Sequence, residues 1–200
     1  MAAVPASTMS REDREKHVLA VAGELFYARG VHEVGMDELI RATGLGKATV
    51  YRLFATKDEL IGAYLRRLAA EILGLIDGDI ERHADDPPAA VAAIFAAIGS
   101  DLQRPGFRGC AFNNASIEFD DPQHVARAAA REYRAALHAR LHALADRVLP
   151  ARPDEAEALA GQLATLIDGA YTSAAHLGPD GPAAAGLALA RALVDRAGSA

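Results

Sequence analysis

Two short amphipathic segments, separated by the tripeptide Gly44-Leu45-Gly46, constrain this chain more than any other feature of its sequence. Residues 36–43 and 47–54 each have the length and apolar spacing of a short helix, and acidic residues occupy the first turn of the earlier one. Gly44 takes the positive φ of a tight turn without the steric cost that a Cβ imposes. The pattern therefore predicts helix, turn and helix.

The same glycines raise the question of a phosphate-binding loop, which the sequence excludes. A P-loop requires G-x-x-x-x-G-K-[ST], because its backbone N–H groups surround the phosphate. Here Gly46-Lys47 is followed by Ala48, and Arg41 stands where the first glycine of the motif belongs. The glycines therefore belong to the turn.

The two sides of the second segment differ in chemistry. Its apolar residues, with those of the preceding helix and turn, are expected to face inward, and they are Leu39, Leu45, Val50 and Phe54. The outward residues form a small basic face with hydroxyl groups, made of Lys47, Ala48, Thr49, Tyr51 and Arg52. Such a helix fits the major groove of DNA, where cations reach phosphates and small side chains meet base edges. For an isolated helix, a merely solvated basic face is the alternative.

Charge is distributed unevenly along the chain. The formal net charge is -6, which by itself argues against binding to nucleic acid. Residues 1–57 nevertheless carry a net charge of +1, and residues 58–200 carry -7. The stretch 39–57 contains no acid at all and holds four cations. The sequence therefore predicts a local basic patch on an acidic body.

Almost all of the chain has the pattern of helices, and no strand pattern or internal repeat is present. A helix over 11–29 ends at Gly30, and the box Thr56-x-x-Glu59 opens a long helix. Asp86-Pro87 and Asp121-Pro122 each predict a helix that starts at a proline, and so does Pro153. We expect about nine helices in an all-α fold.

Two domains without a flexible linker follow from this pattern. Residues 1–57 are expected to form a helix-turn-helix DNA-binding domain, with residues 1–10 as a disordered tail, and residues 58–200 are expected to form a larger helical domain. The single cysteine excludes an internal disulfide and favours the cytoplasm. No apolar run has the length of a membrane span, and no signal peptide is evident.

Residues 14–60 resemble the DNA-binding domain of the TetR family of transcriptional regulators. The matching pieces, in order, are Leu25-Phe26, Arg29-Gly30, Met36-Asp37, Gly44-Leu45, Lys47-Ala48-Thr49-Val50-Tyr51-Arg52, Phe54 and Thr56-Lys57-Asp58-Glu59-Leu60. The resemblance implies a homodimer whose two recognition helices read a near-palindromic operator. It also implies that residues 58–200 form an effector-binding and dimerisation domain, in which a small organic effector binds and releases the DNA.

Carried onto this sequence, the resemblance assigns DNA contacts to eight residues. They are Gly35, Gly46, Lys47, Ala48, Thr49, Tyr51, Arg52 and Lys57. The family often has Thr where Gly35 stands and Ser where Gly46 stands, so at these two positions only backbone N–H donors remain. Leu53 replaces a His or Tyr that commonly contacts phosphate.

The resemblance also suggests residues for the effector pocket. The Gly-Cys stretch at 109–110 is similar to one that opens the cavity-lining helix in part of the family. The candidates are Phe95, Phe107, Cys110, Phe112, Asn113, Tyr133 and Tyr171. Core packing of the aromatic residues is the alternative, and for Cys110 the alternatives are an inert buried thiol and a redox-active one.

For the last two helices, the resemblance implies a four-helix dimer interface. The stretch 166–170 is similar to the common central stretch of the family's interface helix. The expected interface residues are Leu159, Leu163, Leu166, Ile167, Ala170, Ala174, Leu189 and Leu193. Packing within one chain is the alternative reading of the same pattern.

We therefore expect a transcriptional regulator, a repressor that a small effector releases from its operator, without cofactor, metal or membrane attachment. His138 and His142 have the i, i+4 spacing of metal ligands, but Arg140 lies between them and no H-E-x-x-H motif is present. A small helical enzyme is one alternative, although no catalytic motif supports it. An interaction protein that keeps the helix-turn-helix as a scaffold is the other.

Overall fold

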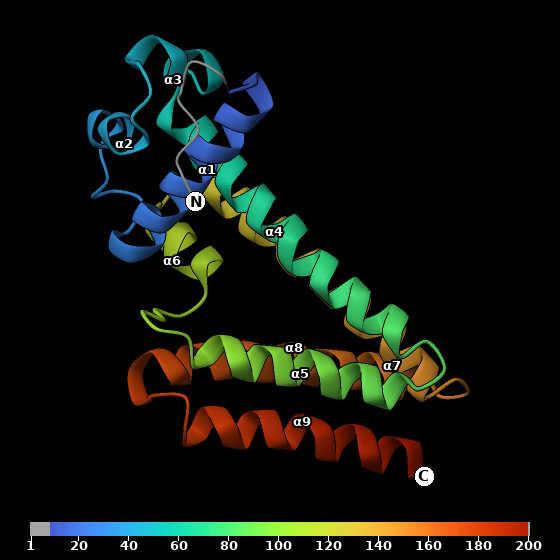
Figure 1. Ribbon diagram of the computed structural model, residues 1–200. Coiled ribbons are helices and arrows are strands. Elements are labelled where there is room, and N and C mark those ends of the chain that lie inside the picture. Colours follow the sequence, from blue (N-terminus) through green and yellow to red (C-terminus); the bar gives the residue numbers. More distant parts are fainter. Residues whose placement is uncertain (1–8, 200) are drawn as a thin grey trace. The chain divides into compact units, whose positions relative to one another are not determined.

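A computed structural model describes residues 9–199, which contain nine helices and no strand (Figure 1). The helices are α1 (Arg11–Arg29), α2 (Met36–Thr43), α3 (Lys47–Leu53), α4 (Lys57–Arg82), α5 (Pro87–Leu102), α6 (Ala111–Ile117), α7 (Val125–Val148), α8 (Pro153–Leu177) and α9 (Pro182–Ser199). The predicted all-α fold is confirmed for this part of the chain. All but the last two residues of the predicted tail, 1–10, lie outside the described residues. None of the described helices is both long enough and apolar enough to cross a membrane.

Several helix ends follow directly from local chemistry. Ser10 and Asp13 form a reciprocal capping box at the start of α1, in which the Asp13 N–H donates to Ser10 Oγ over 3.0 Å. Gly30 ends α1 with a φ of 93°, as predicted. Asp86 accepts the N–H of Ala89 over 3.0 Å, and so caps α5 as its sequence predicts.

The start of α7 differs from the prediction. Asp121-Pro122 was expected to begin the helix, but α7 begins at Val125. The Asp121 carboxylate accepts the N–H of Gln123 over 2.8 Å and so closes a turn before the helix. His124 takes over the cap, because its Nδ1 accepts the N–H of Ala126 over 3.2 Å. The Asp121 carboxylate is thus engaged in the turn that precedes the helix, and it does not cap α7.

The chain divides into two compact units. The first unit holds the described residues up to 68 together with 111–131, and the second unit holds 69–110 and the described residues from 132 onward. Helices α4 and α7 each continue from one unit into the other. Helix α6 and the start of α7 thus belong with the helix-turn-helix. The division of functions at residue 57 stays a prediction.

The first unit is built around the buried side of α1 and the first half of α4. The rings of Phe26 and Tyr64 lie 5.9 Å apart and join these two helices. The buried residues of this unit include Val18, Ala22, Val34, Leu39, Val50, Leu60, Ile61, Leu65, Phe112 and Ala115. Gly62 lets α4 pass close to α7, since a Cβ at this position would lie 2.5 Å from Val125 Cγ2.

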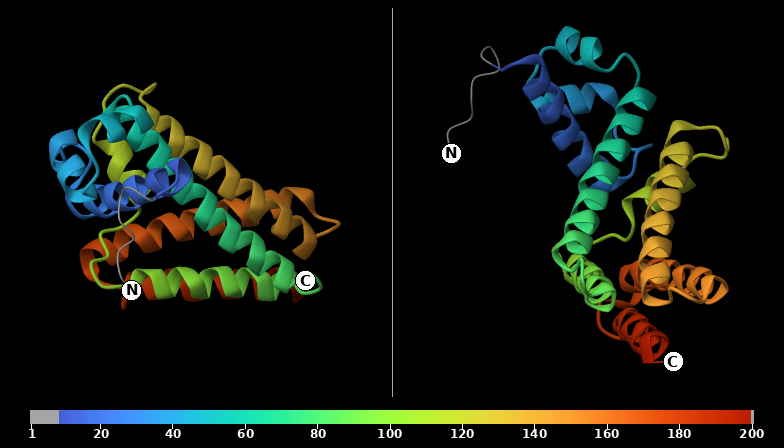
Figure 2. Two further views of the ribbon diagram at one scale, coloured as in Figure 1. Left: turned by 45° about the horizontal axis from the view of Figure 1, so that its top comes forward. Right: turned by 90° about the vertical axis from the view of Figure 1, so that its right-hand side faces the viewer.

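In the second unit, α5, α8 and α9 pack side by side (Figures 1 and 2). Their apolar sides share a core with the segments of α4 and α7 that belong to this unit, through residues such as Ile76, Ile94, Leu141, Leu144, Leu163 and Val194. A bidentate ion pair fastens α4 to α7, in which Arg140 Nε lies 2.6 Å from Asp77 Oδ1 and Arg140 Nη2 lies 2.7 Å from Asp77 Oδ2. This hydrogen-bonded pairing lowers the pKa of Asp77.

The close approach at Gly62 gives a stability prediction. Gly62→Ala should destabilise the protein by about 1–3 kcal/mol, because the added methyl group overlaps a stiff β-branched side chain. Gly74→Ala is the matched control in the same helix. Nothing lies within 4 Å of its added Cβ, so it should stabilise by roughly 0.5–1 kcal/mol. Urea unfolding followed by circular dichroism measures both, and a neutral or stabilising Gly62→Ala would contradict the packing.

The ion pair of Asp77 predicts a pH-dependent contribution to stability. A carboxyl group whose pKa is lowered on folding contributes stability above its ordinary pKa of about 4, and this contribution is lost as the pH falls through the lowered value. Asp77→Asn should therefore cost about 0.5–1 kcal/mol at pH 7, since the pair is half-exposed and screened. The difference between variant and wild type should decrease steadily as the pH falls below about 4. A cost that persists undiminished in acid would show that the ion pair is not its source.

Candidate nucleic-acid interface

The turn between α2 and α3 is built as the glycine pattern predicts. Gly44 has a φ of 66°, in the left-handed region. Leu39, Leu45, Val50 and Phe54 are all buried, which confirms the expected inward face. With its apolar side buried in this way, α3 has one face left for solvent.

A buried threonine supports the turn, and sequence reasoning did not foresee its role. The hydroxyl of Thr43 donates to the carbonyl of Ile40 over 2.8 Å and accepts the N–H of Leu45 over 3.2 Å. Nε2 of His17 donates to the carbonyl of Thr43 over 2.8 Å and ties the end of α2 to α1. The sequence signal was a hydroxyl-bearing residue at a buried helix end. Alanine at this position would leave the N–H of Leu45 without its acceptor.

The two glycines assigned to DNA contacts are the N-caps of α2 and α3. Neither Gly35 nor Gly46 offers a side chain to cap its helix. A Cβ at Gly35 would have no neighbour within 4 Å, and one at Gly46 would lie 3.9 Å from Thr49 Oγ1. Both helix starts are therefore open to close approach of another molecule.

Lys47 stands at the start of α3, is exposed, and already has an anionic partner. Its Nζ lies 2.9 Å from Oδ1 of Asp37 in the first turn of α2, and 5.9 Å from the centroid of the Tyr51 ring. The hydrogen bond with Asp37 raises the pKa of Lys47 and lowers that of Asp37. Sequence reasoning placed Asp37 only as a helix-dipole partner, because a contact across the turn is not visible in helical spacing.

The other outward residues of α3 are either exposed or hydrogen-bonded within the helix. Tyr51 is 38% exposed, Ala48 is exposed and Thr49 is half-buried. Arg52 folds back along its own helix, where its Nε donates to the carbonyl of Ala48 over 3.2 Å and its Nη2 to Thr49 Oγ1 over 3.4 Å. The exposed part of the predicted face that makes no hydrogen bond within α3 is therefore centred on Lys47, which pairs with Asp37 of α2, and on Ala48 and Tyr51.

Lys57, the last residue assigned to phosphate contact, is directed toward protein backbone. Its Nζ donates to the carbonyl of His32 over 3.2 Å. Burial lowers the pKa of Lys57, while the carboxylates of Glu118 and Asp58 oppose that shift. The cap of its helix follows the predicted Thr56–Glu59 box in part: Thr56 Oγ1 accepts the N–H of Glu59, whereas the Glu59 carboxylate accepts from Ala55.

The effector candidates are placed in both units and do not share one described pocket. Phe95 and Phe112 are buried in the cores of the second and the first unit, respectively. Asn113 is half-buried in the first unit. The other four candidates are half-buried in the second unit, and they are Phe107, Cys110, Tyr133 and Tyr171.

Some of these second-unit candidates form an aromatic and charged cluster. The Tyr171 hydroxyl donates to Asp101 Oδ2 over 2.9 Å, and its ring lies 5.8 Å from that of Phe107. Arg104 lies over the Phe107 ring at 5.6 Å and pairs with Asp101. Burial raises the pKa of Tyr171, and likewise that of Tyr133, so both phenols are neutral hydrogen-bonding groups at pH 7.

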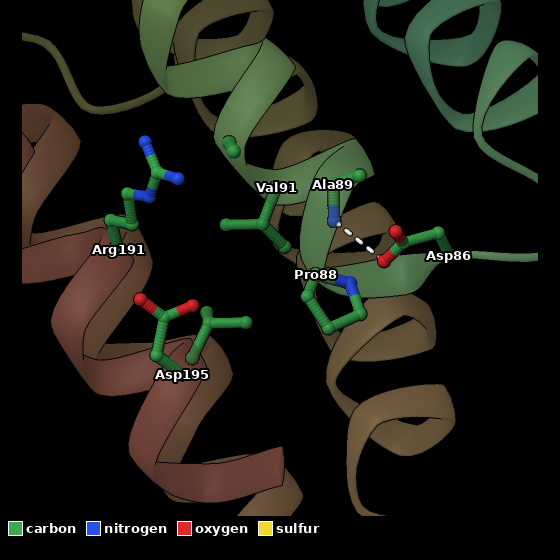
Figure 3. A pocket seen from close by; sticks show the side chains of 8 residues that line it. Asp86, Pro88, Ala89, Val91, Arg191 and Asp195 are labelled. Carbon is green, nitrogen blue, oxygen red and sulfur yellow. Dashed lines mark hydrogen bonds between the residues drawn. The ribbon is translucent and has the colours of Figure 1, made fainter.

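A shallow pocket of about 220 Å³ lies elsewhere in the second unit, between the start of α5 and the end of α9 (Figure 3). Arg191 and Asp195 project toward it from α9, and Pro88 and Val91 line the opposite side. None of the effector candidates lines this pocket.

His142, whose spacing from His138 is that of metal ligands, lies between two carboxylates. Its Nδ1 lies 3.1 Å from Asp146 Oδ2, and its Nε2 lies 2.9 Å from Glu157 Oε2.

The residues expected at a dimer interface are mostly internal to one chain. Leu159, Leu163, Ile167, Ala170 and Ala174 are buried within the single chain, so they have little surface left for a partner. Leu189 is 45% exposed, and Leu166 and Leu193 are half-buried. Sequence periodicity identified the apolar side of α8, but it could not tell which neighbour covers that side.

Comparisons with known proteins agree with this geometry. The family model described as bacterial regulatory proteins, tetR family, matches residues 18–64. A TetR-family transcriptional regulator from Streptomyces coelicolor has a TM-score of 0.84 at 28% identity, over 92% of this chain and 96% of that one. A TetR-type regulator from Streptomyces avermitilis has a TM-score of 0.72 at 30% identity, over 92% and 97%.

Among curated relatives, the HTH-type transcriptional activator FasR of Mycolicibacterium smegmatis is 33% identical over 103 residues, which are 50% of this chain and 46% of FasR. The match thus spans about half the length of that relative. Since both the helix-turn-helix and the nine-helix architecture are shared, this chain belongs to the tetR family of bacterial regulatory proteins, a family of transcriptional regulators and not of enzymes.

Proposed function

We propose that this chain is a DNA-binding transcriptional regulator that inserts α3 into the major groove of its operator. The observation that carries the proposal is the outward face of α3, where Lys47, Ala48 and Tyr51 are exposed while Val50 on the opposite side is fully buried. The segment 39–57 around this face has no acidic residue. A short helix anchored on one side and polar on the other is the element that helix-turn-helix proteins place against base edges.

Each exposed group has a distinct task in such a complex. Lys47 and the Tyr51 hydroxyl contact phosphates, which supplies salt-dependent affinity and sets the register of α3. Ala48 is small enough to approach base edges and thymine methyl groups. A phosphate must compete with the Asp37 carboxylate for the Lys47 ammonium group. Asp37 therefore weakens nonspecific attraction of this face to DNA.

A homodimer provides the second recognition helix. On α8 the exposed residues Ala158, Gln162, Thr165, Gly169 and Thr172 recur at alternating spacings of four and three and carry no charge. On α9, exposed Ala185, Leu189 and Ala192 continue the same pattern. Small uncharged residues allow helices of two copies to approach closely about a two-fold axis. The two α3 helices would then lie about 34–36 Å apart, one turn of DNA.

A small organic effector binding in the second unit regulates the operator complex in this proposal. The cluster of Asp101, Arg104, Phe107 and Tyr171 is the best-supported contact region, because it combines aromatic surface with ion-paired groups. The effector acts by favouring a spacing of the recognition helices that the operator does not accept, which makes the chain a repressor. Action as an activator, the role for which FasR is named, is the alternative, in which the effector favours the DNA-bound state.

An interaction protein that uses the helix-turn-helix only as a scaffold is the second candidate. Two observations favour it: Lys47 is paired with Asp37, and Lys57 donates to a backbone carbonyl. Both cations are therefore partly compensated within the protein. Binding to duplex DNA at increasing salt separates the two candidates, because a regulator that contacts phosphates must lose affinity steeply as salt rises.

Two substitutions on α3 test the DNA-binding proposal. Lys47→Ala should lower affinity for a duplex that the wild-type protein selects from a random pool, and should reduce the salt slope by about one. Tyr51→Phe should weaken binding through the loss of its hydroxyl contact alone. Arg191→Ala, which removes an exposed cation from α9, is the control and should leave affinity within about twofold. Wild-type affinity and salt dependence in both α3 variants, measured by fluorescence anisotropy, would refute the assignment.

A glycine on α8 tests the dimer. Gly169→Arg should be tolerated within one chain, since nothing lies within 4 Å of an added Cβ, but should place a charge in the proposed interface. Sedimentation should show a monomer and a matching loss of operator affinity. Gly74→Arg is the control, because this helical glycine of α4 is equally unobstructed. If Gly169→Arg sediments as a dimer, the interface lies elsewhere.

A further inference from the structure

Glu118 connects α6 to the turn that follows α1. It comes directly after the last residue of α6, and its carboxylate accepts two consecutive backbone N–H groups. The N–H of Val31 donates to Oε1 over 2.9 Å, and the N–H of His32 donates to Oε2 over 2.7 Å. These residues are 87 and 86 positions away in the sequence, and all of them lie in the first unit. The bonds are charge-assisted, which makes them stronger than ordinary amide hydrogen bonds.

The turn and the carboxylate are closely fitted to each other. Gly30 has a φ of 93°, which a residue with a Cβ rarely adopts. A Cβ at Gly30 would also lie 2.9 Å from Glu118 Oε1. Val31 is almost completely buried, so its N–H has no access to bulk water if the carboxylate is withdrawn. The turn therefore depends on Glu118 to satisfy its backbone.

The residues after Glu118 reinforce this connection. The Phe119 ring lies 4.7 Å from the ring of His32 and stacks at 3.4 Å on His124. His124 in turn lies 3.5 Å from Asp58 at the start of α4. The backbone of His32 is held on both sides: its N–H donates to Glu118, and its carbonyl accepts from Lys57 Nζ. The segment 118–124 thus fixes both the α1–α2 turn and the first turn of α4.

We propose that Glu118 is a positioning residue for DNA binding, which holds the α1–α2 turn and thereby sets the orientation of α2 and of α3 packed against it. This inference rests on the function proposed above. It places a determinant of operator affinity outside the residues 18–64 that match the family model. Glu118 contacts no DNA in this proposal, and it acts through the turn alone.

Glu118→Gln provides the test, because it keeps the shape of the side chain and replaces one acceptor oxygen with a donor. Amide exchange measured by NMR should become at least about tenfold faster at residues 31 and 32 and stay unchanged at the buried residues of α1. Affinity for a duplex that the wild type selects from a random pool should fall about tenfold. Asp120→Asn is the matched control: it removes the same charge from the same segment but none of the described hydrogen bonds, and should change neither readout by more than about twofold.

The two readouts together decide the proposal. Faster exchange with unchanged DNA affinity would show that Glu118 holds the turn but does not position α3. Unchanged exchange would show that Glu118 does not hold the turn. Either result overturns the role of Glu118 and leaves the proposed function standing. A wild-type chain that selects no duplex would overturn the proposed function as well. If Glu118→Gln does not fold, Glu118→Asp keeps the charge and withdraws it by one methylene, and smaller changes in the same direction at both readouts are expected.

Discussion

The burial of one side of α3 is the constraint on which the rest of the structure depends. Val50 is fully buried, Leu39, Leu45 and Phe54 are buried as well, and this fixes which side chains of α3 remain in solvent. A seven-residue helix has too few internal hydrogen bonds to be stable alone, so packing against the first unit maintains it. The turn at Gly44 contributes to this packing, because its left-handed φ of 66° ends α2 and reverses the backbone before α3 begins.

Charge on this face is more restrained than a count of lysines and arginines suggests. Lys47 is paired with Asp37, Arg52 bonds to its own helix, and Lys57 donates to the carbonyl of His32. In the proposed complex, phosphates compete with these internal partners. Such competition lowers affinity for any DNA and leaves more of the discrimination to base contacts, which a regulator searching a genome requires.

The grouping of α6 with the helix-turn-helix places Glu118 and the turn that it holds in one compact unit. The second unit contains the aromatic cluster of Phe107 and Tyr171, whereas α6 lies in the first unit and Glu118 follows its last residue. A carboxylate that satisfies two backbone N–H groups is sensitive to small displacements, because hydrogen bonds weaken steeply with distance and angle. The same unit division explains why Phe107 and Phe112, close in sequence, belong to different cores.

Local chemistry in the sequence was sufficient to predict the nine helices, the cap at Asp86, the glycine turn and the buried side of α3, because each depends on residues within a few positions of one another. The start of α7 was mispredicted where two local uses competed for one side chain of Asp121. Only the tertiary structure decided the partners of Lys47, Lys57 and Glu118, and which sides of α8 are internal. Those contacts join residues far apart in the chain, and helical periodicity shows that a face is apolar or charged but not which neighbour it meets.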